Sequence, residues 1–327
     1  MDINSVGFHS LEPPRFCNPA QPNEGYKRLA GEIERMQQGG LVIALGQLGC
    51  LEGIQNVESK FTRVPEFDEG RTASRQGVYF GTLGVSSERH LPISSHIAVK
   101  PYDRRRVDLG ARPSVALVHD IATSAHLRAI SSSSAYVPMG VYRSHDTFLV
   151  PNLLTNFEER SSSLDGVFRQ TETRHPIELK VLHAMRLGHF GLGVLHGAKI
   201  THGDAFPQNF ATDGNRVVMN DTTTFRPFGA KTLAVKLKTT EDTQNFMQGV
   251  FHPDASTDFT RTVSASVLRH PSVVPTLWRA YIDGVGLSLR RLGEASAPLG
   301  VIQEDDHARI IRAVIEKYAE APTVSGA

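Results

Sequence analysis

The chain has 327 residues, of which 40% are apolar and 21% are charged. These fractions are typical of globular proteins, and they exclude a wholly disordered chain, a collagen-like chain and a disulfide scaffold. Lysine and arginine exceed aspartate and glutamate by only 35 − 34 = 1, so no overall positive field would hold a nucleic acid or a membrane surface. The length predicts two globular units, or one domain built from two lobes.

The sequence predicts a cytoplasmic protein without a membrane partner. Its start, Met-Asp-Ile-Asn, lacks the basic and then apolar order of a secretory signal. The longest purely aliphatic run, residues 41–45, is far shorter than the roughly 20 residues of a membrane span. Cys17 and Cys50 have neither a CxxC spacing nor a second pair beside them, so we expect two structural thiols.

The N-terminal part predicts an extension with one helix. Residues 1–24 contain four prolines among polar residues, which favours an irregular arm lying on a surface. From residue 25 to residue 38 apolar side chains recur at helical spacing before Gly39 and Gly40. This pattern predicts an amphipathic helix.

The next part of the chain is rich in β-strand patterns. Strands are predicted over residues 61–67, 77–85, 96–102, 135–142 and 147–154, and a helix over 114–130. The first three strands form a meander that begins with a hairpin. Beyond residue 155 the pattern becomes helical, with helices predicted over 177–194, 263–292 and 307–319. The fold class is therefore α+β, with a short connection near 151–156 between the halves.

The densest group of polar residues lies in the helical half. His202-Gly203-Asp204 is followed by Asn209, and Asp221 comes directly after the apolar run 217–219 and Asn220. Transfer of a phosphoryl group needs a carboxylate at the acceptor hydroxyl and oxygen ligands for Mg²⁺. Asp204, Asn209 and Asp221 supply both kinds of group, and a short strand over 217–219 would bring Asp221 beside the loop.

Residues 193–204, Gly-Val-Leu-His-Gly-Ala-Lys-Ile-Thr-His-Gly-Asp, resemble the helix and catalytic loop of the protein-kinase-like superfamily. The His-Gly-Asp form is typical of its aminoglycoside and choline kinase branch. The resemblance spans roughly residues 65–225 and implies a two-lobed fold, with a small antiparallel sheet of five strands and one helix before a larger, mainly α-helical lobe. It divides the chain into an extension (1–58), a nucleotide-binding lobe (59–152) and a lobe that carries the catalytic loop and the acceptor site (153–327).

The resemblance implies an enzyme that uses ATP and Mg²⁺. Asp204, Asn209 and Asp221 correspond to the catalytic positions, and Asn209 and Asp221 also to the metal ligands. Lys100, in Ala98-Val99-Lys100, corresponds to the strand lysine that contacts the phosphates, and Asp120 to the helix acid that pairs with it. The nucleotide-binding positions implied are Gly70, Thr72, Ser74, Gly77, Ala98, Lys100, Asp120, Pro151, Asn152 and Leu153.

The sequence also departs from the family pattern. Asp120 stands where the family has glutamate, residues 70–77 do not form a GxGxxG motif, and Asp221-Thr222-Thr223 replaces Asp-Phe-Gly. No Ala-Pro-Glu follows, so control by phosphorylation of an activation loop is not expected.

The leading hypothesis is transfer of the γ-phosphate of Mg·ATP to a hydroxyl group of a small molecule, with a protein acceptor left open. Three alternatives stay open on the same fold: a nucleotide-binding pseudokinase or interaction module, an atypical protein kinase, and an enzyme that transfers the nucleotide part of ATP.

A different class of enzyme, a metal hydrolase, would use His196, His202, Asp204 and Asp221 as ligands. The absence of an HExxH helix and the presence of Asn209 favour the phosphotransferase. Two further features have simple structural interpretations. Arg104-Arg105-Arg106 lies between acidic residues and predicts a solvated turn, whereas Trp278 and Tyr281 recur at the spacing of a core-facing helix. The resemblance to the protein-kinase-like superfamily implies that His202 has a structural role in the loop, through packing and hydrogen bonding, and does not transfer a proton.

Overall fold

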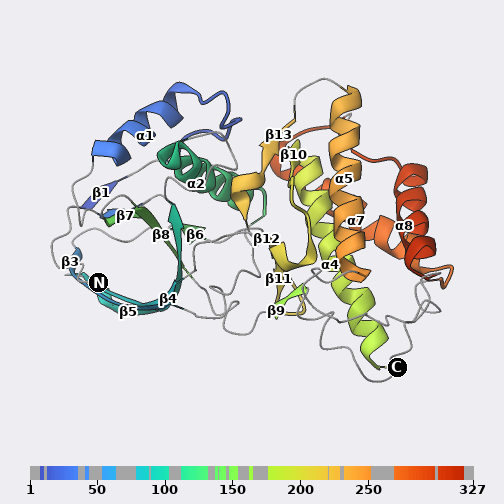
Figure 1. Cartoon of the computed structure of the whole chain (residues 1–327), viewed down its shortest axis with the longest axis horizontal. Helices are drawn as coiled ribbons and strands as arrows, with labels where there is room; N and C mark the ends of the chain where they lie inside the picture. The colour runs from blue at the N-terminus through green and yellow to red at the C-terminus, as the bar shows by residue number, and fades with distance from the viewer. Residues whose placement is uncertain are drawn as a thin grey trace, which may run out of the picture. The chain divides into compact units, whose positions relative to one another are not determined.

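The structure is a computed structural model of the chain, and it divides into two compact units, Met1–His126 with Tyr136–Glu159 and Leu127–Ala135 with Arg160–Ala327. Figure 1 labels their helices and strands. The structure describes residues 8–10, 13–35, 41–43, 54–63, 79–87, 90–102, 112–131, 137–138, 140–144, 147–153, 162–164, 176–219, 221–228, 232–251, 269–298 and 301–319. The chain is of the α+β class, as predicted.

A mainly antiparallel sheet of eight described strands forms the first unit, in the order β1-β2-β7-β8-β5-β4-β3, with β6 beside β8. Among the described strands, only β1 and β2 pair in parallel. The bounds are β1 Phe8–Ser10, β2 Leu41–Ile43, β3 Ile54–Arg63, β4 Tyr79–Ser87, β5 His90–Tyr102, β6 Val137–Pro138, β7 Gly140–Ser144 and β8 Thr147–Leu153.

The predicted meander is confirmed, because β3, β4 and β5 pair in sequence order. The prediction of five strands is wrong for this sheet. Strands β1 and β2 come from the N-terminal residues, where an irregular arm and one helix were predicted, and β6 is a short addition. Strands of two or three residues are too short for a period-two pattern, and only their pairing partners reveal them.

Helices α1 (Glu24–Arg35) and α2 (Pro113–Ile130) pack together in the first unit. Tyr26 and Ile33 of α1 are fully buried in one cluster with Leu117 of α2 and Tyr102 of β5. A polar bond joins the same helices, since Ser114 Oγ donates to Glu34 Oε1 at 2.6 Å. The helix predicted from residue 25 is therefore confirmed, and its apolar face covers the helix that carries Asp120.

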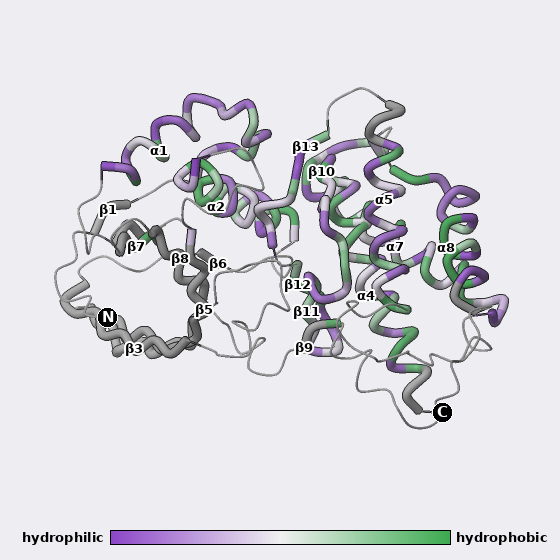
Figure 2. Tube along the Cα trace, in the orientation of Figure 1, coloured by the Kyte–Doolittle hydropathy of each residue, from purple (hydrophilic) through white to green (hydrophobic). Residues whose placement is uncertain are grey.

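The second unit is built around α4 (Pro176–Gly197), α5 (Thr232–Phe251), α7 (Val273–Leu292) and α8 (Glu304–Ala319). Figure 2 shows hydrophobic residues along much of α4, whereas α1 of the other unit is largely hydrophilic. Helices α4 and α7 approach each other closely at glycines. A Cβ at Gly193 would lie 2.0 Å from the carbonyl oxygen of Tyr281, and one at Gly284 would lie 2.2 Å from that of Phe190.

The predicted helices of this unit are confirmed with two corrections. Helix α7 begins at Val273 rather than at residue 263, because Pro271 disfavours helical geometry in the residue before it. Helix α5 was not predicted, although its buried residues follow helical spacing. Residues 252–268 lie outside the described residues.

Short strands and two 3₁₀ turns connect α4 to α5. Strand β10 (Ile200–Thr201) pairs with β13 (Arg226–Pro227), and β11 (Phe210–Thr212) lies between β12 (Val217–Met219) and β9 (Ser162–Ser163). The 3₁₀ turns are η3 (Pro207–Asn209) and η4 (Thr222–Thr224). The three predicted catalytic residues, Asp204, Asn209 and Asp221, lie in these turns and in the links between the strands.

Candidate active site

The His202-Gly203-Asp204 segment is a sharp turn that leaves strand β10. Gly203 has φ +80°, a conformation in which a side chain is strained. A Cβ at this position would also lie 2.9 Å from the carbonyl oxygen of Thr224. Glycine therefore permits both the turn of the backbone and its close approach to η4, which brings the segment of Asp204 next to the segment of Asp221.

Asp204 and Asn209 are joined directly. The side-chain nitrogen of Asn209 donates to the main-chain oxygen of Asp204 at 2.7 Å and to its Oδ2 at 2.9 Å. Between these two residues, Phe206 N donates to Asp204 O at 2.9 Å, and the main chain then forms the 3₁₀ turn η3. Because the nitrogen of the Asn209 amide makes both bonds, its oxygen is the atom suited to a cation.

Asp221 lies directly before η4 in the left-handed region, with φ 52° and ψ 46°. Its Oδ1 accepts a bond from Thr223 Oγ1 at 2.9 Å. Its main-chain oxygen accepts bonds from Thr224 Oγ1 at 2.9 Å and from Thr224 N at 3.2 Å. The turn therefore holds both the backbone and the carboxylate of Asp221.

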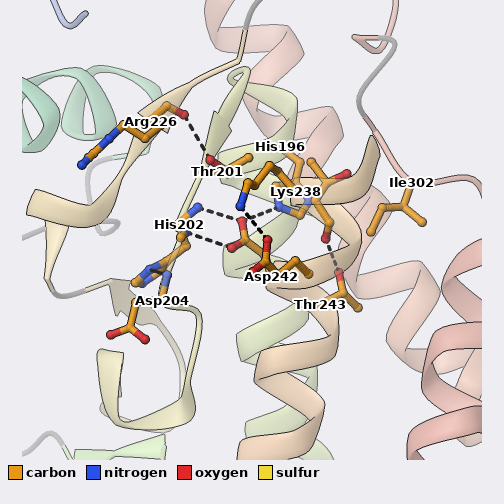
Figure 3. Close-up of polar contacts among 12 residues, drawn as sticks. His196, Thr201, His202, Asp204, Arg226, Lys238, Asp242, Thr243 and Ile302 are labelled. Atoms are coloured by element: carbon orange, nitrogen blue, oxygen red, sulfur yellow. Dashed lines mark hydrogen bonds and ion pairs between the residues drawn. The ribbon is translucent and has the colours of Figure 1, made fainter. Parts of the chain in front are cut away.

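Asp242, from the middle of α5, anchors the His202-Gly203 turn. It is 1% exposed, and its two carboxylate oxygens accept the main-chain N–H groups of His202 at 2.7 Å and Gly203 at 2.9 Å. His196 Nε2 lies 3.3 Å from Asp242 Oδ2. Figure 3 shows these bonds, with the carboxylate of Asp204 pointing away from Asp242. A helix 40 residues further along the chain thus fixes the turn.

Asp242 was missed in the sequence. A signal was present, since Asp242 lies four residues before Phe246 and eight before Val250, both of which are fully buried. An acid on the apolar face of a helix needs hydrogen-bond partners inside the protein. It therefore marks a buried polar site.

His202 packs inside the protein, as its predicted structural role requires. Its ring lies 4.5 Å from that of Phe225 and 5.3 Å from that of Phe210, between ring centroids. Its Nδ1 accepts the N–H of Asp204 at 3.3 Å, so the proton of the neutral ring is on Nε2. No hydrogen-bond partner for Nε2 lies among the described residues.

The electrostatic environment differs between the acids. Burial raises the pKa of Asp204, and the charges of Asp221 and Asp242 act in the same direction, against His202 and the bond from Asn209. Burial alone would raise the pKa of Asp242 too, but the hydrogen bond and charge of His196 hold it below its usual value. Burial lowers the pKa of His202. Asp204 thus has the greater proton affinity, and Asp242 remains an anionic anchor.

The residues predicted to contact the nucleotide lie in the other unit. In the register of β5 and β8, Ala98 pairs with Asn152, while Val99 and Lys100 pair with Pro151 and Val150. Leu153 is the last residue of β8. The sheet therefore brings Ala98, Lys100 and residues 151–153 onto two neighbouring strands, although they are far apart in sequence.

Asp120 is buried on α2 and accepts a hydrogen bond from the hydroxyl of Tyr102. Tyr102 is two residues beyond Lys100 on β5, so this bond ties α2 to the strand that carries the lysine. Gly70, Thr72, Ser74 and Gly77 lie outside the described residues, as do Arg104, Arg105 and Arg106.

The described residues contain no group of three or more histidine, cysteine, aspartate or glutamate side chains arranged to hold a metal ion. Asn209 and Asp221 are an amide and a single carboxylate, a set that suits Mg²⁺ when phosphate oxygens and waters complete the coordination. None of the described helices is long and apolar enough to cross a membrane.

Comparison with known proteins gives matches among solved structures alone. No protein-family model matches the chain, and no curated protein matches its sequence. Among solved structures, WaaP in complex with acyl carrier protein is similar over 91% of this chain and 98% of that chain, with 13% identity and a TM-score of 0.40. A similarity at this level establishes neither a common fold nor a common activity.

Proposed function

We propose that the protein is an ATP-dependent phosphotransferase with a protein-kinase-like fold, which moves the γ-phosphate of Mg·ATP to a hydroxyl acceptor. The observation that carries the proposal is the pair of adjoining turns that holds Asp204 with Asn209 on one side and Asp221 on the other. A carboxylate of raised pKa beside a second carboxylate and an amide oxygen is the donor set that this reaction uses.

In this proposal Asp204 orients the acceptor hydroxyl and accepts its proton. The raised pKa of Asp204 increases its affinity for that proton, while Asn209 keeps the carboxylate oriented. Asn209 and Asp221 would hold Mg²⁺, which supplies charge stabilisation at the phosphate oxygens when it is bound. Asp242 would keep the Asp204 turn rigid, because it fixes two main-chain N–H groups directly before it.

The nucleotide phosphates would be contacted by Lys100, and Asp120 would pair with this lysine. The bond that Tyr102 donates to Asp120 supports this, because it ties α2 to β5, the strand that carries Lys100. Gly70, Thr72, Ser74 and Gly77 would cover the phosphates, and Ala98 with Pro151, Asn152 and Leu153 would line the adenine site. We propose a small molecule as the acceptor, because the His-Gly-Asp loop and the absence of an Ala-Pro-Glu segment are typical of kinases that act on small molecules.

The first experiment measures thermal unfolding of the full chain with ATP, with Mg²⁺, and with both. A ligand at 100 times its dissociation constant stabilises a protein by about 2.7 kcal/mol. We expect a shift that requires both ligands and that is lost in Lys100→Ala and Asp221→Asn. Asp283→Asn, an exposed acid on α7, is the matched control and should retain the shift. A shift that is independent of Mg²⁺, or equal in Asp221→Asn, would contradict the metal assignment.

The second experiment identifies the products of turnover with a panel of hydroxylated small molecules. Production of ADP and a phosphorylated acceptor is expected, and Asp204→Asn should lower kcat by about 10²- to 10⁴-fold while Mg·ATP binding persists. Production of a nucleotide-modified acceptor would instead indicate nucleotide transfer. Mg·ATP binding without turnover of any acceptor, small molecule or protein, would favour the pseudokinase.

A further inference from the structure

The segment that follows Asp221 consists of Thr222, Thr223 and Thr224. These three threonines form η4, and Asp221 precedes them with φ 52°. Apart from Lys199, Asp221 is the only non-glycine residue with positive φ in the described part of the chain. Since a residue with a Cβ rarely adopts this conformation, local contacts must hold Asp221 in it.

Two of the threonines bind different parts of Asp221. Thr224 binds the backbone, because both its Oγ1 and its N donate to the main-chain oxygen of Asp221. Thr223 binds the side chain, because its Oγ1 donates to Asp221 Oδ1 at 2.9 Å. Thr223 is itself fixed, since it is 7% exposed and its main-chain oxygen accepts a bond from Arg226 Nη1 at 2.7 Å.

A carboxylate can turn about its terminal bond, and a single hydrogen bond from a fixed donor selects one orientation. Metal-binding carboxylates are commonly oriented by such donors in the surrounding shell. Thr222 differs from its neighbour: it is also buried, at 5% exposed, but its hydroxyl is not among the groups that bind Asp221. The two threonines therefore form a natural comparison.

We propose that Thr223 is a positioning residue for the metal site. Its hydroxyl sets the orientation in which the carboxylate of Asp221 meets Mg²⁺. The inference rests on the proposed function, and it adds a residue that takes the place of a glycine in the Asp-Phe-Gly pattern. A glycine at this position has no hydroxyl and could not orient the carboxylate of Asp221, so the proposal assigns a function to the second threonine of Asp-Thr-Thr.

The test is a Mg²⁺ titration of the thermal shift at a fixed, saturating concentration of ATP. Thr223→Val removes the hydroxyl at nearly constant volume, Thr223→Ala removes it with less bulk, and Thr223→Ser keeps it. Thr222→Val is the matched control. We expect the half-saturating Mg²⁺ concentration to rise by about 10- to 100-fold in the valine and alanine variants, to return to within about threefold of the wild type in the serine variant, and to stay unchanged in Thr222→Val.

Two results would overturn the role of Thr223. One is an unchanged Mg²⁺ requirement in both Thr223→Val and Thr223→Ala. The other is an equal rise in Thr222→Val, which would show that any change to η4 has the same effect. Both leave the proposed function standing, whereas a wild-type protein without a Mg²⁺-dependent shift would overturn the proposed function and this inference together. If Thr223→Val does not fold, Thr223→Ala can still be compared with the wild type and with Thr222→Val.

Discussion

Acidification should lower the stability of the second unit through a buried histidine cluster, formed by His189, His196 and His307. His189 and His307 are fully buried, and His189 Nδ1 lies 3.1 Å from His307 Nε2. His307 Nδ1 has no hydrogen-bond partner among the described residues. Burial, with a smaller contribution from the charge of His196, lowers the pKa of His307 from 6.5 to about 3. Burial also lowers the pKa of His189, with His307 and His196 contributing.

The lowered pKa of His307 determines whether stability rises or falls with pH. The neutral ring of His307 suits the folded state, so its contribution is complete above pH 6.5, the pKa of the unfolded chain, and declines as the pH falls toward the folded-state pKa of about 3. Between pH 7 and pH 5 the free energy of unfolding should fall by about 2 kcal/mol through His307 alone. His189 should add to this loss, since its pKa is lowered too.

Urea unfolding at pH 7, 6 and 5 measures this loss. The fluorescence of Trp278 is a suitable signal, because it is the only tryptophan of the chain and its ring centroid lies 5.3 Å from that of His307. His307→Gln replaces the titrating imidazole by a polar amide that does not titrate. We expect this variant to lose about 2 kcal/mol less than the wild type over the same pH range. His270→Gln, an exposed histidine in the second unit, is the matched control.

The pH dependence itself can refute this reasoning. If the wild type and His307→Gln lose the same stability between pH 7 and pH 5, within about 0.5 kcal/mol, protonation of His307 is not linked to unfolding. An equal reduction of the loss in His270→Gln would also contradict it, since that ring is exposed. A wild-type stability that rises on acidification would contradict the sign.

Three substitutions test the packing around the candidate active site. Gly193→Ala places a Cβ 2.0 Å from the carbonyl oxygen of Tyr281 and should cost about 1–3 kcal/mol in urea unfolding, because α4 and α7 must move apart. Gly203→Ala meets both the positive φ and the carbonyl oxygen of Thr224, and should abolish the Mg·ATP shift. Asp242→Asn removes a buried carboxylate that accepts two main-chain N–H groups, and should cost about 3 kcal/mol or more.

Two of these substitutions, Gly193→Ala and Asp242→Asn, have a control nearby. Gly286→Ala, also on α7, meets only the flexible guanidinium of Arg290 at 3.3 Å, so it should be far milder than Gly193→Ala. Glu241→Gln changes the exposed neighbour of Asp242. Equal effects of Glu241→Gln and Asp242→Asn would mean that the turn does not depend on the buried carboxylate. A wild-type Mg·ATP shift in Gly203→Ala would mean that the turn tolerates a side chain.

Local patterns in the sequence were sufficient for several of the long helices, although not for α5. The predicted helix over 114–130 is α2 (Pro113–Ile130), and the one over 177–194 lies within α4 (Pro176–Gly197). Helical periodicity is repeated several times in such segments, so it can be recognised without knowledge of their partners. The contact between Asp204 and Asn209 was likewise predictable, since five residues and a single turn separate them.

The sequence by itself determined the α+β class, the main helices other than α5, and the segment in which Asp204, Asn209 and Asp221 lie. Tertiary structure decided the parts that depend on distant partners. Strands β1 and β2 can be recognised only from the strands with which they pair. Asp242 binds the His202 turn from 40 residues away, and His189 contacts His307 across 118 residues. A buried polar group must be satisfied by whatever the fold brings to it. Its partner is therefore set by packing, and no local pattern encodes it.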